Sequence, residues 1–128
     1  MARLLFGTAG KPHSTPEGST MSAVERIAEL GLDCMEIEFV KGVQMKENVA
    51  VEVAKTASEH NVKLSVHAPY YINLNAKEPE KIIASKERIL HSARIASICG
   101  ARSVVIHTAF FMGDPPETAY AKIKQNLK

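Results

Sequence analysis

The sequence has few cysteines and no long apolar run. Cys34 and Cys99 are the only cysteines among its 128 residues, and they form no C-x-x-C motif. A domain of this size can bury a sufficient core without disulfides or a structural metal. The start of the chain lacks a signal-peptide pattern, and no stretch of about 20 apolar residues is present to span a membrane. We therefore expect a soluble protein of a reducing, cytoplasmic compartment.

The chain also lacks a strong charge of either sign. Sixteen Lys and Arg against fourteen Asp and Glu leave a net charge of +2, too weak to predict a nucleic-acid binder, although a locally basic groove remains compatible with it. The segment from Gly7 to Pro12 contains two glycines and a lysine, but its spacing differs from that of a phosphate loop. A nucleotide-binding loop is therefore not expected.

Short apolar runs alternate with helical patterns along the whole chain. Strands are predicted at residues 4–7, 34–40, 63–67 and 103–107, and helices at 21–31, 45–59, 79–99 and from 115 onward. Ser19 or Thr20, Pro79 and Asp114 are suited to begin three of the helices. The apolar stripe expected on the third helix consists of Ile82, Ile89, Leu90, Ala93 and Ala96.

Four consecutive βα units without a hairpin signal predict an α/β fold with parallel strands. The alternatives are a small open sheet and part of a (β/α)₈ TIM barrel, which takes about 250 residues. We interpret residues 1–128 as one domain, the N-terminal half of such a barrel. Four strands alone leave open edges and an uncovered inner face, so we expect a missing C-terminal half-barrel or self-association to complete it.

Two of the predicted strands end in a histidine, His67 and His107. The C-terminal ends of parallel strands are where α/β proteins place their chemistry. Strand alternation puts both side chains opposite the purely apolar positions, and neighbouring strands lie about 4.8 Å apart. The pair could therefore reach one ion at Zn–N distances of about 2.0–2.1 Å, which predicts part of a metal site. The alternative is a pair of hydrogen-bonded core histidines.

Carboxylates and tyrosines accompany these histidines. Glu36 and Glu38 share one face of the second strand, and Glu38 near its end is our candidate catalytic residue, as a ligand, a general base or a partner that fixes a histidine tautomer. A purely structural hydrogen-bonded carboxylate is the alternative. Tyr70 and Tyr71 follow His67, where they either stack on a ligand or pack their loop onto the next helix. The remaining histidines, His13, His60 and His91, are expected in solvated structural positions.

The stretch His67-Ala-Pro-Tyr-Tyr-Ile-Asn-Leu74, followed by Ile106-His107, resembles the endonuclease IV family of AP endonucleases, in the xylose-isomerase-like TIM-barrel group. That family hydrolyses the phosphodiester 5′ to abasic sites in double-stranded DNA, a DNA-repair reaction, with three zinc ions. The resemblance implies that His67 and His107 hold one zinc, that Tyr70 contacts DNA and that Asn73 supports its loop. The family's other ligands come from strands five to eight, so we expect the isolated chain to be inactive.

Two departures point to a divergent branch of that family. The Gly-Ala-His-Val-Ser-like opening of bacterial members is replaced by a segment running from Gly7 to His13, and the Pro-Gly that commonly follows the histidine of strand four is Thr108-Ala109. Two further functions stay open. One is a sugar isomerase or epimerase of the same superfamily, with a single divalent metal and with Glu36 or Glu38 moving a proton. The other is a non-catalytic half-barrel fragment.

Overall fold

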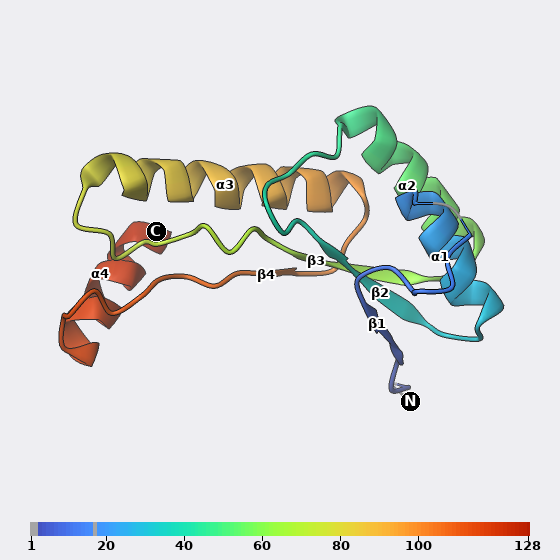
Figure 1. The fold of residues 1–128 in the computed structure, drawn as a ribbon, viewed down its shortest axis with the longest axis horizontal. Helices are drawn as coiled ribbons and strands as arrows, with labels where there is room; N and C mark the ends of the chain where they lie inside the picture. The colour runs from blue at the N-terminus through green and yellow to red at the C-terminus, as the bar shows by residue number, and fades with distance from the viewer. Residues whose placement is uncertain (1–2, 17) are drawn as a thin grey trace.

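The computed structural model describes residues 3–16 and 18–128, which contain four parallel strands in one sheet (Figure 1). The strands are β1 (Gly7–Ala9), β2 (Cys34–Glu38), β3 (Lys63–His67) and β4 (Val104–Val105). Their order in the sheet follows the chain, β1-β2-β3-β4, and each neighbouring pair is parallel. This topology confirms the four consecutive βα units that the sequence predicts.

A helix follows each strand. The helices are α1 (Thr20–Glu29), α2 (Glu47–Glu59), α3 (Pro79–Ile98) and α4 (Pro116–Leu127). Figure 1 shows α1, α2 and α3 on one side of the sheet, with α4 at the far end of α3. In the part of the chain that the structure describes, no helix is both long enough and apolar enough to cross a membrane.

The core lies between the sheet and the first three helices. Met35 and Ile37 of β2 and Leu64 and Val66 of β3 are 0–6% exposed and pack in one cluster with residues of α1, α2 and α3. The alternate positions on these strands are half-buried or exposed, so the polar face of the sheet is turned away from the helices. The period of two in the sequence thus correctly separates a core face from a polar face.

Three helix ends follow the local chemistry that the sequence predicts, and one differs. The hydroxyl of Ser19 accepts the backbone N–H of Ser22 at 3.1 Å and caps α1. Gly31 follows the end of this helix with φ +71°, a left-handed conformation in which a residue without Cβ is favoured. Pro79 is the first residue of α3, as predicted. Asp114 does not cap α4; Pro115 is the N-cap residue.

The two outer strands differ from the prediction. The first strand begins at Gly7 instead of ending there, and Gly7 pairs with Cys34. The two residues are so close that a Cβ on Gly7 would lie 1.7 Å from the Cys34 carbonyl oxygen. Leu4 lies before the strand and is 71% exposed. Strand β4 contains only two residues, because its partner β3 ends at His67, which is in register with Val105.

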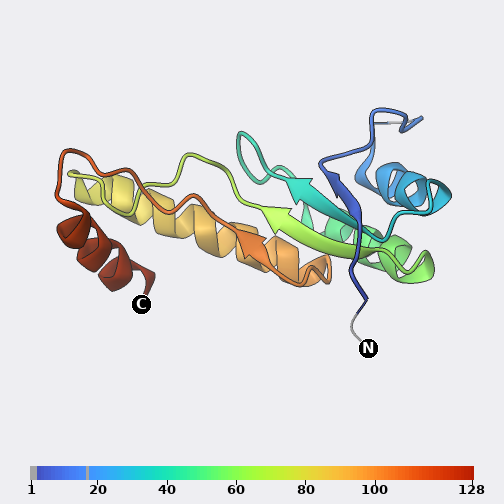
Figure 2. The same cartoon turned by 90° about the horizontal axis from the view of Figure 1, so that it is seen from below.

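The apolar stripe predicted for α3 is also wrong in part. Leu90 is 69% exposed, whereas Ser85 and Ser92 are buried together with Ile95 and Ala96. The sheet does not extend beneath the N-terminal half of α3, where the extended segment after β3 lies instead (Figure 2). Small hydroxyl side chains fit against this backbone, and Ser85 accepts the N–H of Asn73 at 2.9 Å. Along this face a backbone contact at Ser85 accompanies the apolar packing of Ile89 against the cluster of Ala68, Ile72 and Leu74.

Candidate metal site at the strand ends

The two predicted histidines meet at the C-terminal end of the sheet. His67 is the last residue of β3, and His107 lies two residues beyond β4. Their Nε2 atoms are 3.0 Å apart, and the ring centroids are 5.0 Å apart with the planes tilted by 37°. The predicted close approach of His67 and His107 is confirmed, although only one of the two residues belongs to a strand.

A carboxylate holds the other nitrogen of His67. Glu36 Oε1 lies 3.0 Å from His67 Nδ1, although Glu38 is the residue in register with His67. A carboxylate accepts hydrogen bonds, so Nδ1 is the nitrogen that donates to Glu36, and in the neutral imidazole Nε2 then carries the lone pair. In this tautomer His107 Nε2–H donates to His67 Nε2. The Glu36 contact thus orients the His67 ring with Nε2 toward His107.

The spacing of the two Nε2 atoms fits a single ion. Two nitrogens on one tetrahedral zinc, each at about 2.0–2.1 Å, lie about 3.3 Å apart. The observed 3.0 Å therefore requires only a small outward movement of the rings. Within residues 3–16 and 18–128, no group of three or more His, Cys, Asp or Glu is arranged to hold a metal. The described residues thus bring together two candidate ligands, His67 and His107, and one carboxylate, Glu36.

Glu38 borders the histidine pair, but the carboxylate hydrogen-bonded to His67 is that of Glu36. A Cβ built on Gly10 would lie 3.2 Å from Glu38 Oε2, so this carboxylate is directed toward the exit of β1. It also lines a small hollow of about 160 Å³ next to the two imidazoles. The residues around this hollow are Glu38, Phe39, Val40, His67, Ala68, Tyr70 and His107. The catalytic role of Glu38 stays a prediction.

Tyr70 and Tyr71 lie on the loop that follows His67, with both rings about half exposed. Their ring centroids are 4.5 Å apart and their hydroxyls are 3.4 Å apart. The hydrogen bond with Tyr71 raises the pKa of Tyr70 above its ordinary value. Tyr70 reaches the hollow beside the histidines, and Arg88 of α3 donates to the Tyr71 carbonyl at 3.1 Å. The loop is anchored through its backbone while both rings stay accessible.

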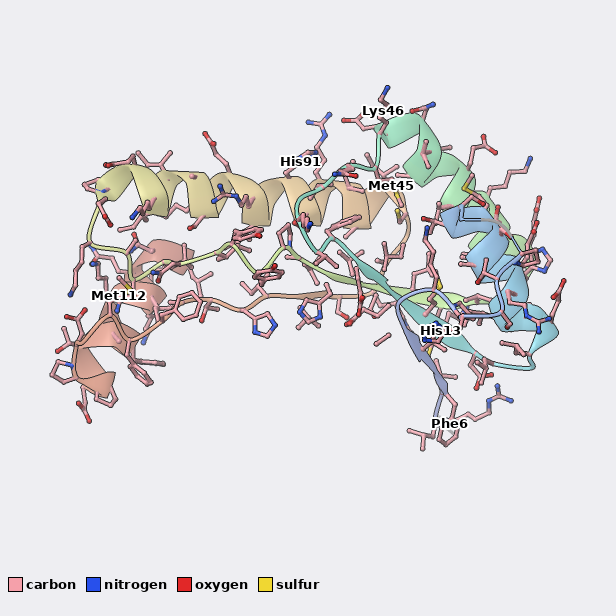
Figure 3. The ribbon with its side chains drawn as sticks, in the orientation of Figure 1. Phe6, His13, Met45, Lys46, His91 and Met112 are labelled. Atoms are coloured by element: carbon pink, nitrogen blue, oxygen red, sulfur yellow. The ribbon has the colours of Figure 1, made fainter. Side chains whose placement is uncertain are left out.

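The other histidines lie elsewhere. His13, His60 and His91 are all exposed, on the loop after β1, at the end of α2 and on α3. Figure 3 labels His13 and His91 on separate parts of the molecule. Their predicted exclusion from the site agrees with these positions.

A second, larger hollow of about 970 Å³ lies between the loops that follow β1 and β2, and the sequence did not predict it. Its floor includes Met35, Ile37 and Phe39, and Lys11, Lys41 and Lys46 are among its lining residues. It forms where two βα loops separate above the core. Loop conformation, which the local sequence pattern does not determine, creates this space.

The architecture defines a class of protein. A parallel α/β sheet with helices on one face and potential ligands at the C-terminal strand ends is half of a TIM barrel. The chain belongs to the xylose isomerase-like TIM barrel family, whose model matches residues 24–128.

Relatives by sequence include one archaeal and one bacterial protein. The chain is 40% identical over 125 residues to the uncharacterized protein MJ0133 of Methanocaldococcus jannaschii, a match that covers 98% of this chain and 44% of that protein. It is 32% identical over 71 residues to a probable endonuclease 4 of Geobacillus sp. WCH70, covering 54% of this chain and 24% of that protein. The chain thus spans less than half the length of these relatives.

Solved structures share the fold. Endonuclease IV from Thermus thermophilus superposes with a TM-score of 0.66 over 93% of this chain and 45% of that structure, at 21% identity. The structure of SacUVDE gives a TM-score of 0.63 over 92% of this chain and 50% of that one, at 12% identity. At these identities the likeness establishes the fold, which is half of each barrel.

Proposed function

We propose that this chain forms part of the active site of a metal-dependent phosphodiester hydrolase that incises DNA 5′ to abasic sites. The observation that carries the proposal is the pair of Nε2 atoms of His67 and His107, 3.0 Å apart at the strand ends. The motif from His67 to Leu74 and the similarity to a probable endonuclease 4 support this choice within the family.

The two histidines would hold one zinc ion of the site. A bound zinc supplies Lewis acidity toward a phosphoryl oxygen and activates water near neutral pH. His67 contributes its Nε2 lone pair, and the contact between Glu36 and Nδ1 keeps the ring oriented. His107 must shift its hydrogen to Nδ1, because its Nε2 faces the same point. Glu38, at the edge of the hollow, is placed to accept a proton from a bound molecule.

Tyr70 would contact the DNA next to the reacting phosphate. Its ring is 46% exposed and borders the hollow that both histidines line. Aromatic rings stack on bases or sugars without reading sequence, which suits recognition of a missing base. Extruding an abasic nucleotide costs less than extruding a paired base, because no base pair has to be broken. The substrate of this site would therefore be double-stranded DNA at a lesion.

The test is a strand-incision assay on a duplex with one abasic site. We expect a protein that contains this chain together with a C-terminal half-barrel, loaded with zinc, to incise 5′ to the lesion, and its H67A and H107A variants to lose most of this activity. The isolated 128-residue chain should show little or none, because two histidines hold a divalent ion weakly. Efficient incision by the isolated chain, or full activity of H67A, would contradict the proposal.

A sugar isomerase or epimerase is the second candidate. Two carboxylates favour it, because Glu36 contacts His67 and Glu38 lines the adjoining hollow, an arrangement suited to moving a proton on a small substrate. Interconversion of aldoses and ketoses by the same zinc- or manganese-loaded protein, lost in the E38Q variant and without DNA incision, would select this function. Metal binding without either activity would favour a non-catalytic metal-binding domain.

A further inference from the structure

His107 occupies its position without support from the sheet ladder. Strand β4 ends at Val105, and the last backbone bond to β3 on this side is donated by Ala68 to the Val105 carbonyl at 2.9 Å. The ring of His107 nevertheless meets His67 at 3.0 Å. Because His107 lies outside the ladder, its position depends on other contacts, among them the packing of Ile106 against the cluster of Ala68, Ile72 and Leu74.

Those contacts come from the segment that follows β3. The segments after β3 and β4 run side by side along α3 to α4 in both ribbon views (Figures 1 and 2). One backbone bond joins them directly, from Leu74 N–H to the Thr108 carbonyl at 2.9 Å. The bond is made by the residue next to His107, so it limits the movement of the histidine.

Asn73 adds a two-pronged acceptor. Its Oδ1 accepts the backbone N–H of Asn75 at 3.1 Å and that of Phe110 at 3.2 Å. A single oxygen therefore bonds within the segment that follows β3 and also to the segment that follows β4. The Asn73 N–H in turn donates to the Ser85 hydroxyl of α3, which attaches Asn73 to this long helix.

Asn75 adds two donors. Its side chain is fully buried, and Nδ2 donates to the carbonyls of Phe110 at 3.0 Å and Phe111 at 2.9 Å. Buried amide hydrogen bonds resist opening, since a broken one leaves an unpaired polar group without water. Asn73 and Asn75 together make these four side-chain hydrogen bonds, to Asn75, Phe110 and Phe111, and we call the set the asparagine clamp.

We propose that Asn73 and Asn75 are positioning residues that hold His107 at the distance from His67 at which both bind one metal ion. The proposal rests on the proposed function for the metal, but the geometry it describes does not. Three of the four clamp contacts end on Phe110 or Phe111, within four residues of His107. Loss of the clamp would leave Leu74 N–H to Thr108 as the nearby cross-segment backbone bond.

A matched pair of variants separates positioning from general stability. N73A removes the two-pronged acceptor, whereas N73D keeps an oxygen at the same place. The control is N126A, because Asn126 of α4 donates to the Leu74 carbonyl at 3.0 Å and so anchors the same segment through a bond that is not part of the asparagine clamp. All three should lower thermal stability to some degree, so binding is measured well below each melting temperature.

The probe is Cu²⁺ alone, the first-row divalent ion that imidazoles bind most tightly. We expect N73A to weaken binding at the pair about tenfold, the size typical of losing a supporting contact behind a metal ligand. N73D and N126A should stay within about threefold of the parent, and H107A should define the background from the exposed histidines. Equal affinity for N73A and the parent, or an equal loss in N126A, would overturn the proposal.

A second readout needs no metal. Nuclear Overhauser contacts between the ring protons of His67 and His107 should be visible in the parent and N73D and lost in N73A. If the parent binds no more Cu²⁺ than H107A, the metal function fails, while this contact still decides whether the asparagine clamp positions the rings. Retention of the contact in a folded N73A variant would show that the clamp does not set the pair.

Discussion

At His67, the two ring nitrogens have different partners. Nδ1 faces the carboxylate of Glu36 and Nε2 faces His107, both at 3.0 Å. A carboxylate behind a histidine fixes its tautomer and raises its basicity as a ligand. Glu38 is in register with His67 but is directed toward Gly10. The two neighbouring carboxylates therefore have separable effects on the same imidazole.

We expect E36Q to weaken zinc binding by the chain by several-fold to about tenfold, because a neutral amide is a poorer acceptor behind a metal ligand. E38Q should leave zinc affinity nearly unchanged, since Glu36 and not Glu38 is hydrogen-bonded to His67. Competition with a coloured chelator measures both. A loss in E38Q equal to that in E36Q would show that Glu38 is a ligand.

Cys99 and Cys34 should differ in reactivity. Burial raises the pKa of the Cys99 thiol to about 11, so only about one molecule in a thousand carries the thiolate at pH 8. Its sulfur lies 3.6 Å from the sulfur of Met45, inside the core. Cys34 is half-buried. We expect a disulfide reagent to modify Cys34 in the native protein and Cys99 only after unfolding.

The C34S variant is the control, and it should show no rapid modification in the folded state. Fast native labelling of C34S would mean that the region around Cys99 opens readily.

At the scale of elements, the sheet uses its two faces differently. Leu64 of β3 is 3% exposed and packs in the core under the helices, whereas Ser65 is half-buried on the polar face. We expect L64A to lower the free energy of unfolding by about 2–4 kcal/mol, through lost burial and a residual cavity. S65A should change it by less than about 1 kcal/mol. Denaturant unfolding measures both, and equal costs would contradict a one-sided core.

Helix α4 is attached through two side-chain hydrogen bonds and one apolar contact. Ala119 is its buried residue, while Lys122 donates to the Ala76 carbonyl at 2.8 Å and Asn126 to the Leu74 carbonyl at 3.0 Å. Asp114, just before the helix, pairs with Lys77. These hydrogen bonds to backbone carbonyls add to one apolar contact, the packing of Ile123 against the cluster that contains Ile72 and Leu74.

The Lys77–Asp114 contact predicts a pH dependence. The hydrogen bond from Lys77 lowers the pKa of Asp114 in the folded state. A lowered folded pKa means that the stabilisation is present above the ordinary value of about 4 and is lost as the pH falls through the folded value. We expect D114N to melt at a lower temperature than the parent at pH 7.

The difference in melting temperature between D114N and the parent should shrink below pH 4. K77M should lower the melting temperature in the same way. The double variant D114N/K77M should melt at nearly the same temperature as either single variant. A constant difference between pH 7 and pH 3 would exclude this ion pair as the cause.

At the scale of the whole molecule, the sheet is open among the described residues. Strands β1 and β4 each have one neighbour, and the face opposite the helices carries the polar alternate positions. Phe110 and Phe111 are each 62% exposed, and Val105 at the edge strand is 42% exposed. Unpaired strand edges and exposed apolar side chains promote association between chains.

We therefore expect the isolated 128-residue chain to self-associate at micromolar concentrations, which sedimentation velocity measures. V105K should reduce association, because a lysine on an edge strand opposes strand pairing. A stable, soluble monomer of the parent at high micromolar concentration would contradict an open half-barrel.

The sequence alone determined the features that depend on local periodicity and end chemistry. Alternation in β2 and β3 identified the core face, because a period of two places alternate side chains on opposite faces. Ser19 and Pro79 marked the starts of α1 and α3. A serine side chain can accept an unpaired backbone N–H of the first turn, and a proline lacks the N–H that would be unpaired there. His67 and His107 were predicted to meet, because the ends of adjacent parallel strands lie at one edge of a sheet.

Only the tertiary structure decided the features that depend on contacts between distant segments. β4 stops at Val105 because its partner β3 ends, a limit set about forty residues away. Glu36 and not Glu38 contacts His67, whereas the Glu38 carboxylate is directed toward Gly10. The direction of each carboxylate depends on residues of neighbouring segments. Asn75 finds its two carbonyl partners 35 and 36 residues further along the chain, and no local pattern encodes such a pairing.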